Sequence, residues 1–228
     1  MPALYLVATP IGNLEDVTFR AIRILREVSL IAAEDTRKTK RLLSAYEIQT
    51  PTTSYHEHNK KSKLPQLLKA FEEGDVALVS EAGMPGINDP GYDLVKSAIE
   101  HNIDVVPIPG PSAIPTALAA SGLTAEQFVH LGFLPRKTGQ RKKLLESLAD
   151  QQRSIVAFES PHRIIATLKD VQEVMGDRRL SICREMTKLH EEIYRGTAVE
   201  AIEHFAKPKG EFTLVIEGKP RKKTNPKP

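Results

Sequence analysis

Two adjacent carboxylates, Glu34 and Asp35, follow the short apolar segment 30–33 and have the chemistry of a general base. A carboxylate beside a reacting hydroxyl accepts its proton, and we take Asp35 as the first candidate for this role and Glu34 as the second. Arg37, two residues further on, is placed to orient the carboxylate or to hold a phosphate. Simple helix capping, with either Asp35 or Thr36 as the N-cap, is an equally good interpretation of the same residues.

Three turns rich in proline and glycine form the second chemical feature, at Thr9–Asn13, Ser80–Gly91 and Pro107–Ala113. Glycine lets a ligand approach the backbone closely, and proline makes the turn rigid. The sequence contains neither a G-x-G-x-x-G motif after its first apolar segment nor a G-x-x-x-x-G-K-[ST] motif, which argues against a dinucleotide site and a P-loop. The turns therefore indicate another kind of ligand cleft, with ordinary tight turns as the alternative.

Basic residues gather in three short segments, 37–41, 136–143 and 219–223, although the net charge of the chain is only +3. Such clustering in a nearly balanced chain suggests a basic face that contacts nucleic-acid phosphates, while separate solvated segments are the alternative. The predicted RNA contacts are the cationic side chains of Arg37, Lys38, Arg136, Lys137 and Arg141.

The elements that position these residues alternate between apolar segments and amphipathic stretches. Segments 4–8, 30–33, 76–79 and 104–108 are predicted strands, and the stretches between them have helical spacing. Continuous apolar strands separated by helices are typical of a parallel sheet covered on both faces. Ligands bind at the carboxyl ends of such strands, where the three turns and the two carboxylates lie.

The second half predicts another α/β domain with a mixed sheet, because two of its strands are joined by a short connection near Lys188. We expect an N-terminal domain over 1–134, a C-terminal domain over 135–218 and a basic, disordered, proline-rich tail over 219–228.

Composition narrows the functional classes. A single cysteine, Cys183, excludes an internal disulfide and a multi-cysteine metal site, and we expect no metal. No apolar run approaches the ~18 residues of a membrane helix, and the first residues lack the pattern of a signal peptide. These features predict a protein of the reducing cytoplasm without a membrane segment.

The motifs as a set resemble the tetrapyrrole (precorrin/corrin) methylase superfamily. The resemblance rests on Leu4–Asp16, Glu34–Arg37, Ser80–Gly91, Pro109–Ala113 and Gly132–Pro135. Two further motifs, Glu159–Arg163 and Arg184–Glu192, are similar to the branch of this superfamily that methylates small-subunit ribosomal RNA.

This resemblance implies two α/β domains that bind S-adenosyl-L-methionine in a cleft, in a homodimer. It implies 2′-O-methylation of a cytidine in the decoding region of 16S ribosomal RNA. The cofactor contacts that it implies are Pro10, Ser80, Glu81, Met84, Ser112, Ala113, Phe158, Glu159 and Met186. The sequence departs from the family pattern at Glu81, where Asp is usual, and at Met84, where Thr is usual. Many members also have a further C-terminal segment.

Two other functions remain open on the sequence. Within the same fold, the alternative is a methylase that acts on a tetrapyrrole. From another class, the alternative is a non-catalytic RNA-binding module, although aromatic residues make up only 5% of the chain and no RNP-type motif is present.

Overall fold

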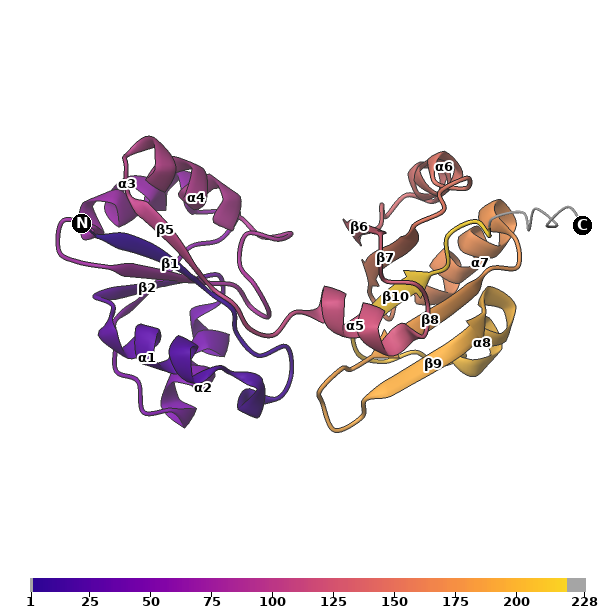
Figure 1. The fold of residues 1–228 in the computed structure, drawn as a ribbon, viewed down its shortest axis with the longest axis horizontal. Coiled ribbons are helices and arrows are strands. Elements are labelled where there is room, and N and C mark those ends of the chain that lie inside the picture. Colours follow the sequence, from indigo (N-terminus) through magenta and orange to yellow (C-terminus); the bar gives the residue numbers. More distant parts are fainter. Residues whose placement is uncertain (1, 221–228) are drawn as a thin grey trace, which may run out of the picture. The chain divides into compact units, whose positions relative to one another are not determined.

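The protein folds into two compact units that divide between Ser112 and Ala113 (Figure 1). The computed structural model describes residues 2–220, so most of the tail predicted over 219–228 lies outside the described residues. The division precedes the sequence-predicted boundary at 134/135. It does so because the helix over 113–121 packs against strands of the second sheet and the strand over 128–133 pairs within that sheet.

The first unit is built on a five-stranded parallel sheet with the strand order β3-β2-β4-β1-β5. Its strands are β1 (Ala3–Val7), β2 (Leu30–Ala33), β3 (Thr52–Ser54), β4 (Val76–Val79) and β5 (Asp104–Ile108). Because all pairings are parallel, every strand ends at the same edge of the sheet. The predicted parallel sheet of the N-terminal domain is confirmed.

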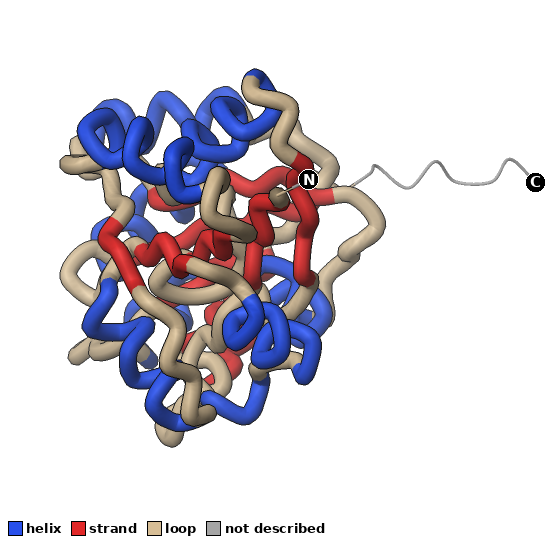
Figure 2. The backbone as a smooth tube through the Cα atoms, turned by 90° about the vertical axis from the view of Figure 1, so that its left-hand side faces the viewer, coloured by secondary structure: helices blue, strands red, loops and turns tan. Residues whose placement is uncertain are grey.

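Helices cover both faces of this sheet, because successive side chains of a strand point to opposite faces (Figures 1 and 2). On one face α1 (Phe19–Glu27) and α2 (Thr36–Ala45) pack against strand residues such as Val7 and Val79. On the other face α3 (Lys60–Ala70) and α4 (Gly91–Glu100) pack against Leu4 and Leu78. A short 3₁₀ turn, η1 (Leu14–Asp16), precedes α1.

The second unit contains a mixed sheet, as the sequence predicts, and its five strands have the order β6-β7-β10-β8-β9. Only β6 and β7 are parallel to each other, and the other neighbours are antiparallel. Its strands are β6 (Phe128–Phe133), β7 (Ser154–Glu159), β8 (Arg179–Arg184), β9 (Glu192–Thr197) and β10 (Phe212–Ile216).

Four helices accompany the second sheet in the part of this unit that the structure describes, which ends at residue 220. They are α5 (Ala113–Ser121), α6 (Thr138–Ser147), α7 (Ile164–Met175) and α8 (Ala198–His204). Leu145 of α6, Leu168 of α7 and Ala201 of α8 share one buried core with strand residues such as Ile155 and Leu214. Helix α5 packs against β8, β9 and β10. None of the helices described over 2–220 is long and apolar enough to cross a membrane.

Candidate functional site

The three Pro/Gly turns of the first unit meet at Gly83. The amide of Thr9 donates to the Gly83 carbonyl over 3.0 Å, and the amide of Gly83 donates back to the Thr9 carbonyl over 2.9 Å. Gly83 has a φ of +80°, and a Cβ placed there would lie 3.6 Å from both Ile11 Cγ2 and the Pro111 carbonyl oxygen. The turns that follow β1, β4 and β5 therefore touch one another at the carboxyl edge of the sheet.

The turn after β4 is held by polar side chains within it. The hydroxyl of Ser80 is 3.3 Å from the Gly83 carbonyl oxygen, to which it donates. The carboxylate of Asp89 accepts hydrogen bonds from the Gly86 amide at 2.8 Å and from the Gly91 amide at 2.7 Å. We did not single out Asp89 from the sequence, although an aspartate before Pro-Gly is typical of such side-chain-closed turns.

Glu34 and Glu81 link the turns after the neighbouring strands β2 and β4. The carboxylate of Glu34 accepts a hydrogen bond from the Glu81 amide at 3.1 Å, and the Glu81 carboxylate forms an ion pair with Lys38. Partial burial raises the pKa of Glu34, and the negative charges of Glu81 and Asp89 act in the same direction. The hydrogen bond from Glu81 and the charge of Lys38 oppose this shift.

Asp35 caps helix α2, and its pKa shifts in the opposite direction to that of Glu34. Its carboxylate accepts hydrogen bonds from the Arg37 amide at 2.8 Å and the Lys38 amide at 3.4 Å, and it pairs with the Arg37 guanidinium at 3.2 Å. These bonds, above all that from the Arg37 side chain, lower the pKa of Asp35 from 3.8 to about 2. A carboxylate with so low a pKa is a weak base, so the structure favours Glu34 over Asp35 for proton transfer.

The cofactor contacts predicted from the sequence are divided between the two units. Five lie at the turns of the first unit, and four belong to the second. We call the first five the turn group, and they are Pro10, Ser80, Glu81, Met84 and Ser112. The glycine at position 83 leaves backbone, rather than a side chain, where these turns meet. This arrangement suits a ligand that is held by close backbone contacts.

In the second unit, Glu159 anchors the turn after β7. Its side chain is fully buried, and its carboxylate accepts hydrogen bonds from the Ser160 amide at 2.8 Å and the Thr167 hydroxyl at 2.7 Å. The guanidinium of Arg163 forms an ion pair with it at 2.6 Å. Both oxygens are therefore engaged within the unit, and Glu159 has a structural role at this position.

The other predicted cofactor residues of the second unit are Phe158, Met186 and Ala113. The ring of Phe158 lies between His130 and Phe133, with centroid distances of 5.0 Å and 5.6 Å. Met186 is buried in the connection between β8 and β9, and Ala113 begins α5.

The cationic side chains predicted to contact RNA differ in accessibility. Arg37, Arg136 and Lys137 are exposed, whereas Lys38 is half-exposed in its ion pair with Glu81. Arg141 is buried, with only 2% of the residue exposed, and its Nε donates to Asp170 over 2.7 Å. Its guanidinium is thus an internal ion-pair partner and is not available to a phosphate.

The partner of Arg141 was also absent from our sequence interpretation. Asp170 lies on the core-facing side of α7, next to the buried Val171 and two residues after the buried Leu168. An aspartate at a core position of an amphipathic helix is itself a sign of a buried partner, because an unpaired charge is costly there.

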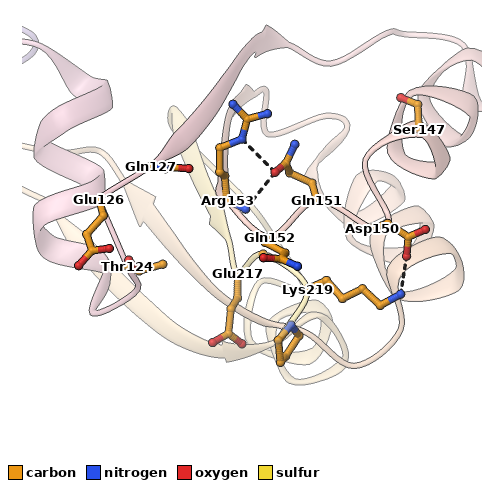
Figure 3. A pocket seen from close by; sticks show the side chains of 12 residues that line it. Thr124, Glu126, Gln127, Ser147, Asp150, Gln151, Gln152, Arg153, Glu217 and Lys219 are labelled. Atoms are coloured by element: carbon orange, nitrogen blue, oxygen red, sulfur yellow. Dashed lines mark hydrogen bonds and ion pairs between the residues drawn. The ribbon is translucent and has the colours of Figure 1, made fainter. Parts of the chain in front are cut away.

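A surface cavity of about 760 Å³ lies in the second unit, and none of the predicted site residues of this unit is among those that line it (Figure 3). It is lined at the amino-terminal ends of β6 and β7, by residues such as Gln127 and Arg153, and by Glu217 just after β10. Of the predicted site residues of this unit, Phe158 and Glu159 lie at the opposite end of β7, and Arg136 and Lys137 follow the opposite end of β6. Within 2–220 no cluster of three His, Cys, Asp or Glu side chains suits a metal ion.

Comparison with known proteins identifies relatives over nearly the whole chain. The family model described as Tetrapyrrole (Corrin/Porphyrin) Methylases matches residues 3–202. A protein of Halalkalibacterium halodurans named Ribosomal RNA small subunit methyltransferase I is 55% identical over 219 residues, which are 94% of this chain and 75% of that protein. A protein of the same name from Thermotoga maritima is 51% identical over 96% of this chain and 100% of its own.

Solved structures with the same fold are more distant in sequence. A cobalt precorrin-4 methyltransferase superposes with a TM-score of 0.70 at 16% identity, over 94% of both chains. A uroporphyrin-III C-methyltransferase from Thermus thermophilus, complexed with S-adenosylhomocysteine, superposes with a TM-score of 0.67 at 18% identity, over 94% of this chain and 97% of its own. At these identities the likeness shows the fold.

We predict that the stabilising effect of Asp35 is lost in acid. Folding lowers the pKa of Asp35 from 3.8 to about 2. The ionised carboxylate therefore stabilises the protein fully at pH values above 3.8, and this contribution falls as the pH drops toward 2. Replacement by Asn should lower the urea midpoint near neutral pH, and the difference from wild type should shrink between about pH 4 and 2. A difference that is independent of pH would contradict the assigned cap interaction.

We predict that Asp170→Ala lowers the free energy of unfolding by about 3–5 kcal/mol, because it leaves the Arg141 charge buried and unpaired. The double variant Arg141→Met/Asp170→Leu should regain most of this loss. Glu173→Ala is the matched control on the same helix, since the Glu173 side chain is 65% exposed in its pair with Lys142. Denaturant unfolding measures all three, and equal losses in Asp170→Ala and Glu173→Ala would contradict the burial of the Arg141 pair.

Proposed function

The chain belongs to the tetrapyrrole (corrin/porphyrin) methylase family, and we propose that it transfers a methyl group to small-subunit ribosomal RNA. It is an S-adenosyl-L-methionine-dependent methyltransferase. The main support for RNA as the substrate is the 55% identity, over nearly the whole chain, to a protein named as a small-subunit ribosomal RNA methyltransferase. The structural neighbours named as precorrin and uroporphyrin enzymes reach only 16–18% identity, so a tetrapyrrole substrate is the weaker candidate.

The acceptor that we propose is the 2′-hydroxyl of a cytidine in the decoding region of 16S ribosomal RNA. This specificity is the one that the motifs over 159–163 and 184–192 imply through their resemblance. A ribose hydroxyl is a poor nucleophile until its proton leaves, so the reaction requires alignment and a base.

The turn group of the first unit provides the residues for the cofactor. Its backbone atoms and the half-buried side chain of Met84 would line the ligand, and the Ser80 and Asp89 side chains hold the turn in one conformation. When bound, S-adenosyl-L-methionine supplies an electrophilic methyl group on a sulfonium centre. Phe158, Met186 and Ala113 of the second unit are further proposed contacts.

Glu34 is the base that we propose. It lies at the carboxyl edge of the first sheet, it is half-buried, and a backbone amide fixes the position of one of its oxygens. Its raised pKa makes it a stronger proton acceptor than Asp35, whose oxygens already bind the start of α2. In the reaction the Glu34 carboxylate would take the proton of the ribose 2′-hydroxyl as that oxygen gains the methyl group, whose bond to the sulfonium sulfur would break to leave S-adenosylhomocysteine.

Exposed cations on each unit would hold the RNA backbone. Arg37 begins α2 in the first unit, and Arg136 and Lys137 precede α6 in the second. Contacts to phosphates position the RNA without reading its sequence, and they make its affinity dependent on salt.

We further propose that the protein acts as a homodimer, as the family resemblance implies, and light scattering of the purified chain tests this. A ribosomal RNA substrate places the activity where ribosomes are assembled, which in bacteria is the cytoplasm.

The proposed activity is tested with purified protein, labelled S-adenosyl-L-methionine and small ribosomal subunits from cells that lack the enzyme. Nuclease digestion and nucleoside mapping should locate one new 2′-O-methylcytidine in the decoding region. Methylation of precorrin instead of RNA would support the tetrapyrrole alternative. A protein that binds RNA and fails to bind S-adenosyl-L-methionine would support a non-catalytic module.

We predict that Glu34→Gln lowers kcat for RNA methylation by about 10²–10⁴-fold and leaves S-adenosyl-L-methionine affinity nearly unchanged. Asp35→Asn is the neighbouring control, and it should retain most of the activity, since its amide oxygen can still cap α2. In the wild type kcat/KM should rise with pH through a pKa above 4.5, the usual value for glutamate, and this rise should vanish in Glu34→Gln. Near-normal turnover of Glu34→Gln would exclude Glu34 as the base.

A further inference from the structure

Two arginines of the second unit, the buried Arg141 and the partly buried Arg163, hold three successive backbone carbonyls of the connection between β6 and α6. Arg163 donates to the Leu134 carbonyl over 3.0 Å. Arg141 donates to the carbonyl oxygens of Pro135 at 3.3 Å and Arg136 at 3.4 Å. We call residues 134–137, from these carbonyls to Lys137, the clamped connection.

Each arginine is itself fixed by a carboxylate in the core of the second unit. Arg163 pairs with Glu159, whose side chain is fully buried, and Arg141 pairs with Asp170, whose side chain is 7% exposed. Burying ion pairs is costly and rarely gains stability over apolar packing. Their geometry here does something that apolar side chains cannot do, because it presents guanidinium donors to the backbone of a loop and so fixes its conformation.

The residue that enters the clamped connection is an exposed aromatic. Gly132, with a φ of +63°, lies within an irregularity of the β6–β7 pairing between His130 and Phe133. Bulges of this kind at edge strands redirect the side chain that follows. The ring of Phe133 leans against Phe158 on one side at 5.6 Å, yet 63% of Phe133 remains exposed.

We propose that Phe133 is a stacking platform for an unpaired base of the RNA substrate, and that Arg136 and Lys137 hold the phosphates beside that base. The Arg163–Glu159 and Arg141–Asp170 pairs are positioning residues that keep the ring and the cations in register. This inference rests on the proposed RNA substrate and adds a specific contact to it.

The chemistry of the segment favours single-stranded RNA over other partners. An exposed aromatic ring next to cations is the combination with which proteins bind unpaired nucleotides, since every base has a face that can stack. Three residues of chain span at most about 10 Å, so the ring and the cations are within reach of neighbouring nucleotides. A loop that is already rigid loses little conformational entropy on binding.

The test compares the affinity of Phe133 variants for a fluorescently labelled single-stranded oligonucleotide that carries the decoding-region sequence. Loss of one stacked base should make binding of Phe133→Leu about 5- to 100-fold weaker, whereas Phe133→Tyr should restore it to near wild type. Phe128→Leu is the matched control, because Phe128 is also an exposed phenylalanine of β6 (42% exposed) at the opposite end of the strand. Its affinity should stay within about twofold of wild type.

The positioning role is tested by a double-mutant cycle in the same assay. Arg163→Lys retains the charge opposite Glu159 but loses the forked geometry that also reaches the Leu134 carbonyl. If the clamp positions Phe133, Phe133→Leu should weaken RNA binding less in the Arg163→Lys background than in the wild type. A merely structural effect of Arg163 would leave the two losses additive.

Two results would overturn the inference. If Phe133→Leu binds RNA with the affinity of the wild type, the proposed stacking contact does not exist. If Phe133→Leu changes the molecular mass of the protein's assembly in solution, a second copy of the chain covers the ring instead. Binding is measured separately from methylation. If the wild type methylates ribosomal RNA and Phe133→Leu binds the RNA as tightly as the wild type does, this inference alone is refuted. A wild-type protein that neither binds nor methylates the RNA refutes the proposed function as well.

Discussion

The parallel pairing of β4, β1 and β5 is the constraint on which the proposed methyl-transfer site depends. Parallel register places the carboxyl ends of three strands at one edge, so turns that are distant in sequence become neighbours. The mutual hydrogen bonds of Thr9 and Gly83 then fix two of these turns to each other. A side chain at position 83 would make ordinary contacts with Ile11 and Pro111, so it is the positive φ of +80° that favours glycine there.

In the second unit, ion pairs fix the conformation of a loop that the backbone hydrogen bonds between turns would fix in the first unit. The turn after β7 is the neighbouring parallel turn of the connection after β6. This connection is held instead by two arginines, which the buried carboxylates of Glu159 and Asp170 keep in position. The energetic logic differs between the units. Backbone hydrogen bonds between turns cost no desolvated charge, whereas a buried arginine is acceptable only while its carboxylate remains in place.

The sequence allowed the fold to be predicted because apolar segments and Pro/Gly turns alternate with helical stretches, and the parallel first sheet and the mixed second sheet are both as predicted. The boundary at 134/135 was less predictable, because a strand such as 128–133 has no local signal for the sheet it joins. The roles of Arg141 and Asp35 could not be read from residue type alone. Cationic clusters look alike whether their members are exposed or buried, and a carboxylate at a helix start acts as a cap or as a base according to its neighbours.

Glu34 and Asp35 show how adjacent residues acquire different chemistry. The chain turns from β2 into α2 between them, so Asp35 receives the unpaired amides of the first helical turn while Glu34 lies beside the turn after β4. Donors around Asp35 stabilise its charge, and partial burial with two nearby carboxylates disfavours the charge on Glu34. Environments that separate the pKa values of neighbouring groups are the usual physical origin of an acid–base residue, and here the separation follows from the helix start itself.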